Sequence, residues 1–330
     1  MIVYLSLSIV AVLSFFSSNR KGAGIIIMGL ILILIISLRY NVGYDYRQYV
    51  KIFSVYPLHD RHVQRLEWFN IFVIKLLRYF SLENFGVFIY SITSYFLLIR
   101  SFKGVKLFMN VLLIWLGIPL FFFASLSTLR QFLSVGVVFF IISRIEYGLF
   151  WRLVLSFLCI GLHQSGVLIF LILFLEWLKL SLKKTLLLGL VIVTVLPYLI
   201  VQASVVLGLD HLIDGRFGTI SGGYLQFWLI FVISIPLLLE NVSKEKYDNN
   251  NIFWIGLALY FVMLPYGLIS SRVFLVFSFY FINLLVKSKY YARLYPRLFL
   301  SSVLLASFYY ALYLGKLQDV NPYLPFNLIF

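Results

Sequence analysis

The stretch GIIIMGLILILIISLRYNVGYDYRQYV, residues 24–50, sets an uncharged apolar run directly before a cluster of charged residues and tyrosines. Inside a bilayer, a chain segment must satisfy its own backbone hydrogen bonds, so the apolar run over residues 24–38 predicts a membrane-spanning helix. The polar residues then stand at the end of a span. Two arginines and an aspartate in that position need a physical reason.

Composition extends this expectation to the whole chain. The 330 residues are 62% hydrophobic and 12% charged, against about 25% charged residues in an ordinary soluble domain. We therefore predict an all-α polytopic membrane protein that forms one domain over residues 1–330. The apolar runs predict about twelve spanning helices, at residues 2–18, 23–38, 84–99, 107–124, 130–143, 150–162, 165–178, 185–207, 225–240, 251–268, 273–286 and 298–315.

One segment fits a membrane span poorly. In LEWFNIFVIKLLRYF, residues 66–80, Glu67, Asn70, Lys75 and Arg78 fall on one side of a helix, opposite a mainly aromatic and aliphatic side. This pattern favours a helix at the membrane interface, and the alternative is a true span that would place the N-terminus inside. The interfacial interpretation gives an extracytoplasmic loop over residues 39–83, and we expect a second such loop at 209–224.

Charge predicts the sidedness of the chain. With twelve helices, 16 of the 27 lysines and arginines fall in loops on one side, which the positive-inside rule makes cytoplasmic. The net charge of +15 is spread over short loops, so we expect no nucleic-acid binding. Arg20 and Lys21 follow the first apolar run rather than precede it, so this run is expected to be a retained helix and not a cleaved signal peptide. The single cysteine, Cys159, allows no disulfide within the chain.

This topology gathers a set of polar side chains on the extracytoplasmic face. The positive-inside rule disfavours arginines there, so their presence suggests a function. Several arginines with few carboxylates suit an anionic ligand, and planar guanidinium groups suit a diphosphate. No Asp, Glu and His cluster has metal-ligand spacing, so we expect neither a metal nor another cofactor. The set comprises Arg39, Arg47, Arg130, Arg216, Arg272, Asp45, Glu67 and His163.

Two members of the set have plain structural alternatives. In SLSTLRQFLSVG, residues 125–136, Arg130 and Gln131 lie on a polar helix stripe with two serines, which favours either a substrate contact or a helix-packing hydrogen-bond network. His163, in LHQSGV, is either a functional residue or a polar cap at a helix end. The glycine-rich segment DHLIDGRFGTISGGY, residues 210–224, contains Arg216 and Tyr224 but matches no established phosphate-binding pattern.

The same segments resemble a known family. RYNVGYDYRQYVKIF is similar to an R-x-x-x-G-x-D-Y-x-x-Y signature, and RLEWFNIF is similar to the Glu-aromatic stretch that follows it. STLRQFLSVGVVFF and GLHQSGVLIF resemble the R-Q and His elements of the EpsG-like group of Wzy-type polysaccharide polymerases, and GRFGTISGGY and SSRVFLVF resemble its later arginine segments. These short motifs occur in the same order over most of the chain.

The resemblance implies a metal-independent glycosyltransferase of GT-C-like architecture in the bacterial inner membrane, with its active site facing the periplasm. Its substrates would be oligosaccharides linked to undecaprenyl diphosphate. The growing glycan of an O antigen or related surface polysaccharide would move from its undecaprenyl diphosphate onto a new lipid-linked repeat unit. Membrane lipid, a chain-length regulator and a flippase are the other partners that the resemblance implies.

Matching positions imply roles for individual residues. Diphosphate binding is expected at Arg130, Arg272 and Arg216, and further substrate contacts at Arg47, Gln131 and Tyr224. Arg39, Asp45 and Glu67 are expected to orient sugars or to structure the loop.

Three residues are candidates for the general base. His163 suits proton removal because its intrinsic pKa lies near neutrality, and Asp45 and Glu67 are the other candidates. The structural alternative for the two carboxylates is an ion pair with Arg39 or Arg47 that fixes the outer loop.

Two other functions suit a membrane bundle with arginines on its outer face. A flippase for lipid-linked oligosaccharide would need charge through the membrane and often two related halves, whereas the predicted helices have almost no charge in their middles and show no repeat. A ligase that joins finished polymer to the lipid A core would share the chemistry. Only the motif resemblance argues against a ligase.

Overall fold

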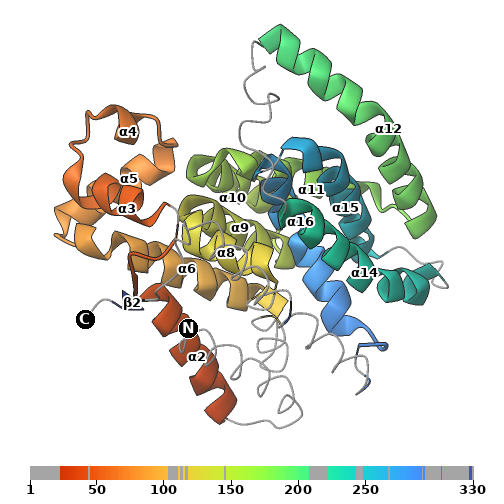
Figure 1. The fold of residues 1–330 in the computed structure, drawn as a ribbon, viewed down its shortest axis with the longest axis horizontal. Helices are drawn as coiled ribbons and strands as arrows, with labels where there is room; N and C mark the ends of the chain where they lie inside the picture. Colours follow the sequence, from red (N-terminus) through yellow and green to blue (C-terminus); the bar gives the residue numbers. More distant parts are fainter. Residues whose placement is uncertain are drawn as a thin grey trace. The chain divides into compact units, whose positions relative to one another are not determined.

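The computed structural model describes most of the chain between its two ends (Figure 1). It describes residues 23–43, 45–102, 111, 114–115, 118–144, 146–207, 222–242, 248–266, 268–291, 293, 306 and 327–328. These are almost entirely helical, in agreement with the predicted all-α class. Where the sequence predicts one domain, the contacts divide the chain into two compact units, Met1–Val167 with Ser301–Phe330, and Leu168–Leu300.

The first unit is built from helices and one very small sheet. Its α-helices are α2 (Ala23–Ser37), α3 (Tyr46–Val50), α4 (Arg61–Gln64), α5 (Trp68–Tyr79), α6 (Gly86–Ser101), α8 (Pro119–Ser127), α9 (Leu129–Ser143) and α10 (Leu149–Leu162). Its shorter turns are the π-helix η1 (Lys51–Val55) and the 3₁₀ helices η2 (Glu83–Phe85) and η3 (Gln164–Val167). Strand β1 (Arg39–Tyr40) pairs antiparallel with β2 (Asn327–Leu328).

Helix α9 is the central element of this unit. It contacts α6, α8 and α10, and its Phe132 and Phe139 pack against the fully buried Trp115. Ser134 of α9 donates to the carbonyl of Cys159 on α10 at 3.0 Å. Because α9 is packed along its length, side chains at its first turn are held in fixed positions.

The chain bends sharply just before α9. Helix α8 begins with Pro119, which suits the first position of a helix because proline lacks an N–H that would go unpaired there anyway. Helices α8 and α9 then meet at Thr128 with an angle of 118° between them, the geometry of a broken span or a re-entrant loop. The sequence predicts two spans at 107–124 and 130–143, so the break at Thr128 lies in the predicted connection between them, but its angle is not predicted.

Residues 45–85 fold into a compact layer on α6 and α9. Tyr46, Tyr49 and Phe53 lie in one buried cluster with Ile74 of α5 and Tyr90 of α6. Arg78 of α5 closes this layer, because its guanidinium donates to the carbonyls of Ile52, Phe53 and Tyr56 at 2.9, 2.8 and 2.6 Å.

Helix α5 buries one face and exposes several aromatic residues on the other. Its Asn70 is buried, whereas Trp68 and Phe72 have more than half of their surface exposed. The predicted helix is therefore present, but its buried face combines Asn70 with the apolar Ile74 and Leu77, and Lys75 of the predicted polar side is exposed. An exposed aromatic face suits contact with lipid.

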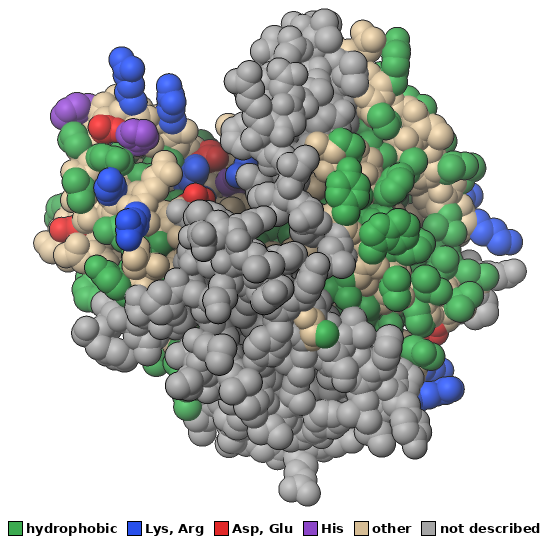
Figure 2. Space-filling view, in the orientation of Figure 1, with side chains coloured by type: hydrophobic (Ala, Val, Ile, Leu, Met, Phe, Trp, Pro, Cys, Tyr) green, Lys and Arg blue, Asp and Glu red, His purple; other side chains and the backbone are tan. Residues whose placement is uncertain are grey.

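The second unit contains the remaining helices. They are α11 (Leu168–Leu178), α12 (Leu182–Leu207), α14 (Gly222–Val242), α15 (Ile252–Met263) and α16 (Leu268–Lys287), with 3₁₀ turns η4 (Asn249–Asn251) and η5 (Leu264–Tyr266). Helix α15 packs on α16 and on α12. The Tyr280 hydroxyl of α16 donates to the buried Glu176 of α11 at 3.0 Å. Figure 2 shows hydrophobic side chains over much of the exposed surface of this unit.

Few described helices have the length of a full span. In the part of the chain that the structure describes, only Leu182–Leu199 and Ser270–Lys287 are long and apolar enough to cross a membrane, with the bent α8–α9 pair as a third if it is one span. Shorter apolar helices occur at Leu149–Leu162, Gln164–Leu178 and Gln226–Val242. The predicted number of about twelve spans is not confirmed. The expected spans at 2–18 and 298–315, apart from residue 306, lie outside the described residues, as does part of 107–124.

Candidate functional site

An ion pair between Glu67 and Arg130 forms the centre of the candidate site. Glu67 directly precedes α5, and Arg130 is the second residue of α9. The Arg130 guanidinium donates to Glu67 Oε2, and the two side chains are 25% and 12% exposed. The pair is thus shielded on most sides while it still reaches the surface.

Tyr49 of α3 completes the contacts of Arg130. Its hydroxyl oxygen accepts hydrogen bonds from both the side chain and the backbone of Arg130. Burial raises the pKa of the Tyr49 phenol above its ordinary value, although the positive charge of Arg130 opposes this shift. Tyr49 is therefore a neutral hydroxyl near pH 7, and it orients Arg130 without removing its charge.

A buried amide holds Glu67 from the protein side. Asn70 donates to Glu67 Oε2 at 3.0 Å and to the carbonyl of Leu162 at 2.7 Å. The Asn70 carbonyl oxygen in turn accepts from the Tyr90 hydroxyl at 3.0 Å. This network connects α5, α6 and the end of α10 beneath the ion pair.

His163 lies beside the same network. The backbone N–H of Gln164 donates to Glu67 Oε1 at 3.3 Å, so the residue after His163 touches the ion pair directly. The imidazole Nδ1 of His163 accepts from the Ser165 N–H at 3.1 Å and lies 2.8 Å from the Ser165 hydroxyl. Glu67, Arg130 and His163 are thus brought together by α5, α9 and η3.

Arg39, another predicted site residue, lies in a different environment. Arg39 is completely buried and donates to the carbonyls of Ile36, Ser125 and Leu126 and to the Ser91 hydroxyl, at 2.9–3.3 Å. Two of these carbonyls are in the last turn of α8, where helical partners are missing, so Arg39 caps α8.

Arg47, Asp45 and Gln131 complete the predicted set in the first unit. Arg47 is exposed and donates to Asn41 at 2.8 Å. Asp45 is half-buried directly before α3, and its charge acts on Tyr49. Gln131, on α9, is buried. Glu67 forms its ion pair with Arg130, and an ion pair of Asp45 with Arg39 or Arg47 stays a prediction.

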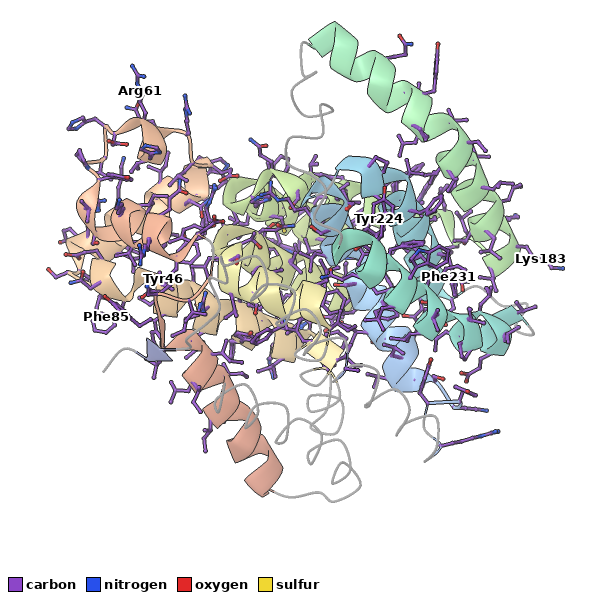
Figure 3. The ribbon with its side chains drawn as sticks, viewed as in Figure 1. Tyr46, Arg61, Phe85, Lys183, Tyr224 and Phe231 are labelled. Carbon is purple, nitrogen blue, oxygen red and sulfur yellow. The ribbon has the colours of Figure 1, made fainter. Side chains whose placement is uncertain are left out.

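The remaining predicted residues belong to the second unit or to the undescribed part of the chain. Arg272 is half-buried in the second turn of α16. Tyr224 is exposed in the first turn of α14, so the expected loop at 209–224 ends in a helix (Figure 3). Arg216 and residues 208–221 lie outside the described residues. Among the residues that are described, no group of three His, Cys, Asp or Glu side chains has a geometry that could hold a metal ion.

Sequence reasoning missed Tyr49, Asn70 and Tyr90. Tyr49 is the last tyrosine of the D-Y-x-x-Y pattern, so a signal for it was present. Asn70 lies three residues after Glu67, and this spacing places both on one side of a helix. Tyr90 is one of several tyrosines in an apolar helix, and no local pattern distinguishes it.

Comparisons with known proteins identify the family. The model of the EpsG family matches residues 23–328, which is nearly the whole chain. Neither the curated proteins nor the solved structures gave a match, so the GT-C-like architecture stays a prediction. The apolar helices together with this match indicate a membrane protein of polysaccharide biosynthesis. The chain belongs to the EpsG family, whose members are Wzy-like polymerases.

Proposed function

We propose that this protein polymerises a bacterial surface polysaccharide such as an O antigen. It transfers the growing glycan from undecaprenyl diphosphate onto a lipid-linked repeat unit at the periplasmic face of the inner membrane. The family match over residues 23–328 carries this proposal. The cluster of Glu67, Arg130 and Tyr49 is the proposed place of the transfer reaction, because it holds a guanidinium in a fixed position at the surface of a helix bundle.

The proposed role of Arg130 is to bind the diphosphate that leaves. Transfer breaks the bond between the anomeric carbon of the glycan and a diphosphate oxygen, which departs with the electron pair. A guanidinium held in position before the reaction stabilises this developing charge without reorganising, and so does the positive end of the dipole of α9. Positive charge from protein side chains would here fill the role that a divalent cation has in other diphosphate chemistry.

The acceptor needs a base and an approach path. Its hydroxyl oxygen forms the new bond to the anomeric carbon, and its proton passes to a base at the same cluster, for which the sequence offers Asp45, Glu67 and His163. The exposed aromatic face of α5 would lie against the membrane, so both lipid-linked substrates would reach the cluster without leaving the bilayer. Arg272, in the second unit, stays a predicted diphosphate ligand.

The first test is deletion of the gene followed by complementation, with the surface glycan separated on a gel. The wild-type chain should restore a ladder of chain lengths. Arg130→Ala should leave single repeat units on the lipid core at a normal protein level, because the diphosphate loses its counter-charge. A full ladder from Arg130→Ala would remove this residue from the proposed site.

A matched control is available on the same helix. Arg144 follows the last residue of α9 and also pairs with a glutamate, Glu146, at 3.2 Å. Arg144→Ala should keep the full ladder, because Arg144 is far along the helix from the site.

If the deletion strain loses all repeat units and not only the longer chains, the protein acts as a flippase or a ligase.

A further inference from the structure

We propose that His163 is a positioning residue for the Glu67–Arg130 ion pair and is not the general base. This inference rests on the proposed polymerase function and narrows the choice of base to the carboxylates. It follows from the hydrogen bonds of Nδ1, from the turn that they hold, and from the contact between that turn and Glu67.

The Nδ1 atom of His163 is a hydrogen-bond acceptor. A backbone N–H can only donate, and the Ser165 N–H points at Nδ1 from 3.1 Å. A hydrogen on Nδ1 would collide with that amide hydrogen, so the neutral ring carries its proton on Nε2. The lone pair that a neutral imidazole offers to a substrate proton is therefore engaged within the protein.

His163 has the geometry of a helix N-cap. Its backbone is extended, with φ −162° and ψ 139°, as N-cap residues usually are. Its side chain accepts the N–H two residues later, and its carbonyl accepts the Gly166 N–H at 2.8 Å. The imidazole thus takes the place of an aspartate or asparagine side chain at the start of η3.

The turn that His163 caps is pressed tightly onto α10. A Cβ atom added at Gly166 would lie 2.3 Å from the carbonyl oxygen of Cys159, which no side chain tolerates. With the turn fixed in this way, the N–H of Gln164 points at Glu67 Oε1. His163 therefore acts through η3 on Glu67, and through Glu67 on Arg130.

An asparagine at position 163 distinguishes an N-cap role of the side chain from a role as general base. The Asn Oδ1 occupies nearly the place of the histidine Nδ1 and is a favoured N-cap acceptor. Asparagine is not a base at neutral pH. His163→Asn therefore keeps the cap and removes any proton transfer by residue 163.

The first measurement is the rate of polymer formation by membranes that contain equal amounts of each variant, with a purified lipid-linked repeat unit as substrate. His163→Asn should stay within about threefold of the wild type and restore the ladder in cells, whereas His163→Ala should lose at least about tenfold. Loss of a general base would cost about 10²- to 10⁴-fold in both variants. A rate for Asn that is as low as that for Ala, or an unchanged rate for Ala, overturns the inference.

A second pair of variants tests the contact with Glu67. Gln164→Pro removes the N–H that Glu67 accepts, and proline fits the first position of a helix after an extended residue such as His163. Gln164→Ala keeps that N–H and is the matched control. We expect Gln164→Pro to lose about tenfold or more in rate and Gln164→Ala to lose less than about twofold. Equal rates for the two variants would show that the η3 contact has no influence on the reaction.

These results are distinguishable from failure of the proposed function. If the wild-type chain restores no ladder and forms no polymer, the polymerase proposal is wrong. If the wild-type chain is active and His163→Asn is not, only the inference about His163 is wrong.

Discussion

Arginines that look alike in the sequence have different roles in the structure. Arg130 pairs with Glu67 and reaches the surface, whereas Arg39 is completely buried and donates to protein oxygens from three helices. Charge pattern alone placed both in one anion-binding set. The partners of Arg39 on α6 and α8 lie 52 to 87 residues away, so no local pattern reveals that it is a structural cap.

Arg39 is therefore expected to control stability. A hydrogen bond to a charged group contributes about 1.5–3 kcal/mol, and Arg39→Lys cannot make all four bonds from a single ammonium group. We expect Arg39→Lys to lower the unfolding temperature of the detergent-solubilised protein by several degrees and to reduce its monodisperse fraction. Arg47→Ala is the control, because Arg47 is exposed and its guanidinium donates to the side chain of Asn41 at the surface. A stable Arg39→Lys protein with normal elution would contradict the capping role.

At the scale of elements, the bend between α8 and α9 places Arg130 in the first turn of a new helix. The bend leaves the last carbonyls of α8 without helical partners, and the segment 39–43 supplies them with Arg39 and with a close backbone approach at Gly43. Gly43 has φ +106°, a conformation that side chains disfavour, and a Cβ there would lie 2.4 Å from the Leu126 carbonyl oxygen. Arg39 and Gly43, four residues apart on one short segment, thus both contact the end of α8 at the bend.

Gly43→Ala should disturb both stability and activity. The backbone must leave φ +106° or the segment must move away from α8, and the strain should cost about 1–3 kcal/mol. Gly148→Ala is the matched control, because a Cβ at Gly148 meets nothing within 4 Å. Thermal unfolding and the glycan ladder should both be impaired for Gly43→Ala and nearly normal for Gly148→Ala. Identical behaviour of the two variants would show that the close approach does not matter.

At the scale of the whole molecule, the sequence predicts the positions of the helices better than the number of helices that span the membrane. Predicted segments 23–38 and 150–162 correspond to α2 (Ala23–Ser37) and α10 (Leu149–Leu162), because a predominantly apolar run leaves the backbone little choice in a membrane. The sequence places a break between residues 124 and 130, but the angle of 118° at Thr128 depends on tertiary packing that no local pattern reveals. The site was predicted in part: Glu67, Arg130 and His163 were named, but the ion pair and Tyr49 depend on tertiary packing.

Sidedness is the whole-molecule property that the charge distribution predicts most directly. Sixteen of the 27 lysines and arginines fall in one set of loops, and the positive-inside rule makes that set cytoplasmic. Arg61, on α4 between residues 39 and 83, is exposed, and so is Lys183 at the start of α12 (Figure 3). Figure 2 shows basic and histidine side chains on the surface around α4, so this segment contacts water whichever face it occupies.

Two cysteine variants test this prediction in a Cys159→Ser background. The natural cysteine is buried, so its replacement by serine changes little at the surface. In spheroplasts, a membrane-impermeant maleimide should label Arg61→Cys, which we expect on the periplasmic side, and should label Lys183→Cys only after the membrane is opened. The exposed position of each residue makes both cysteines reactive once the reagent reaches them. The reverse pattern would place Arg130 and Glu67 on the cytoplasmic side, where the undecaprenyl-linked glycan is not polymerised under the proposed function.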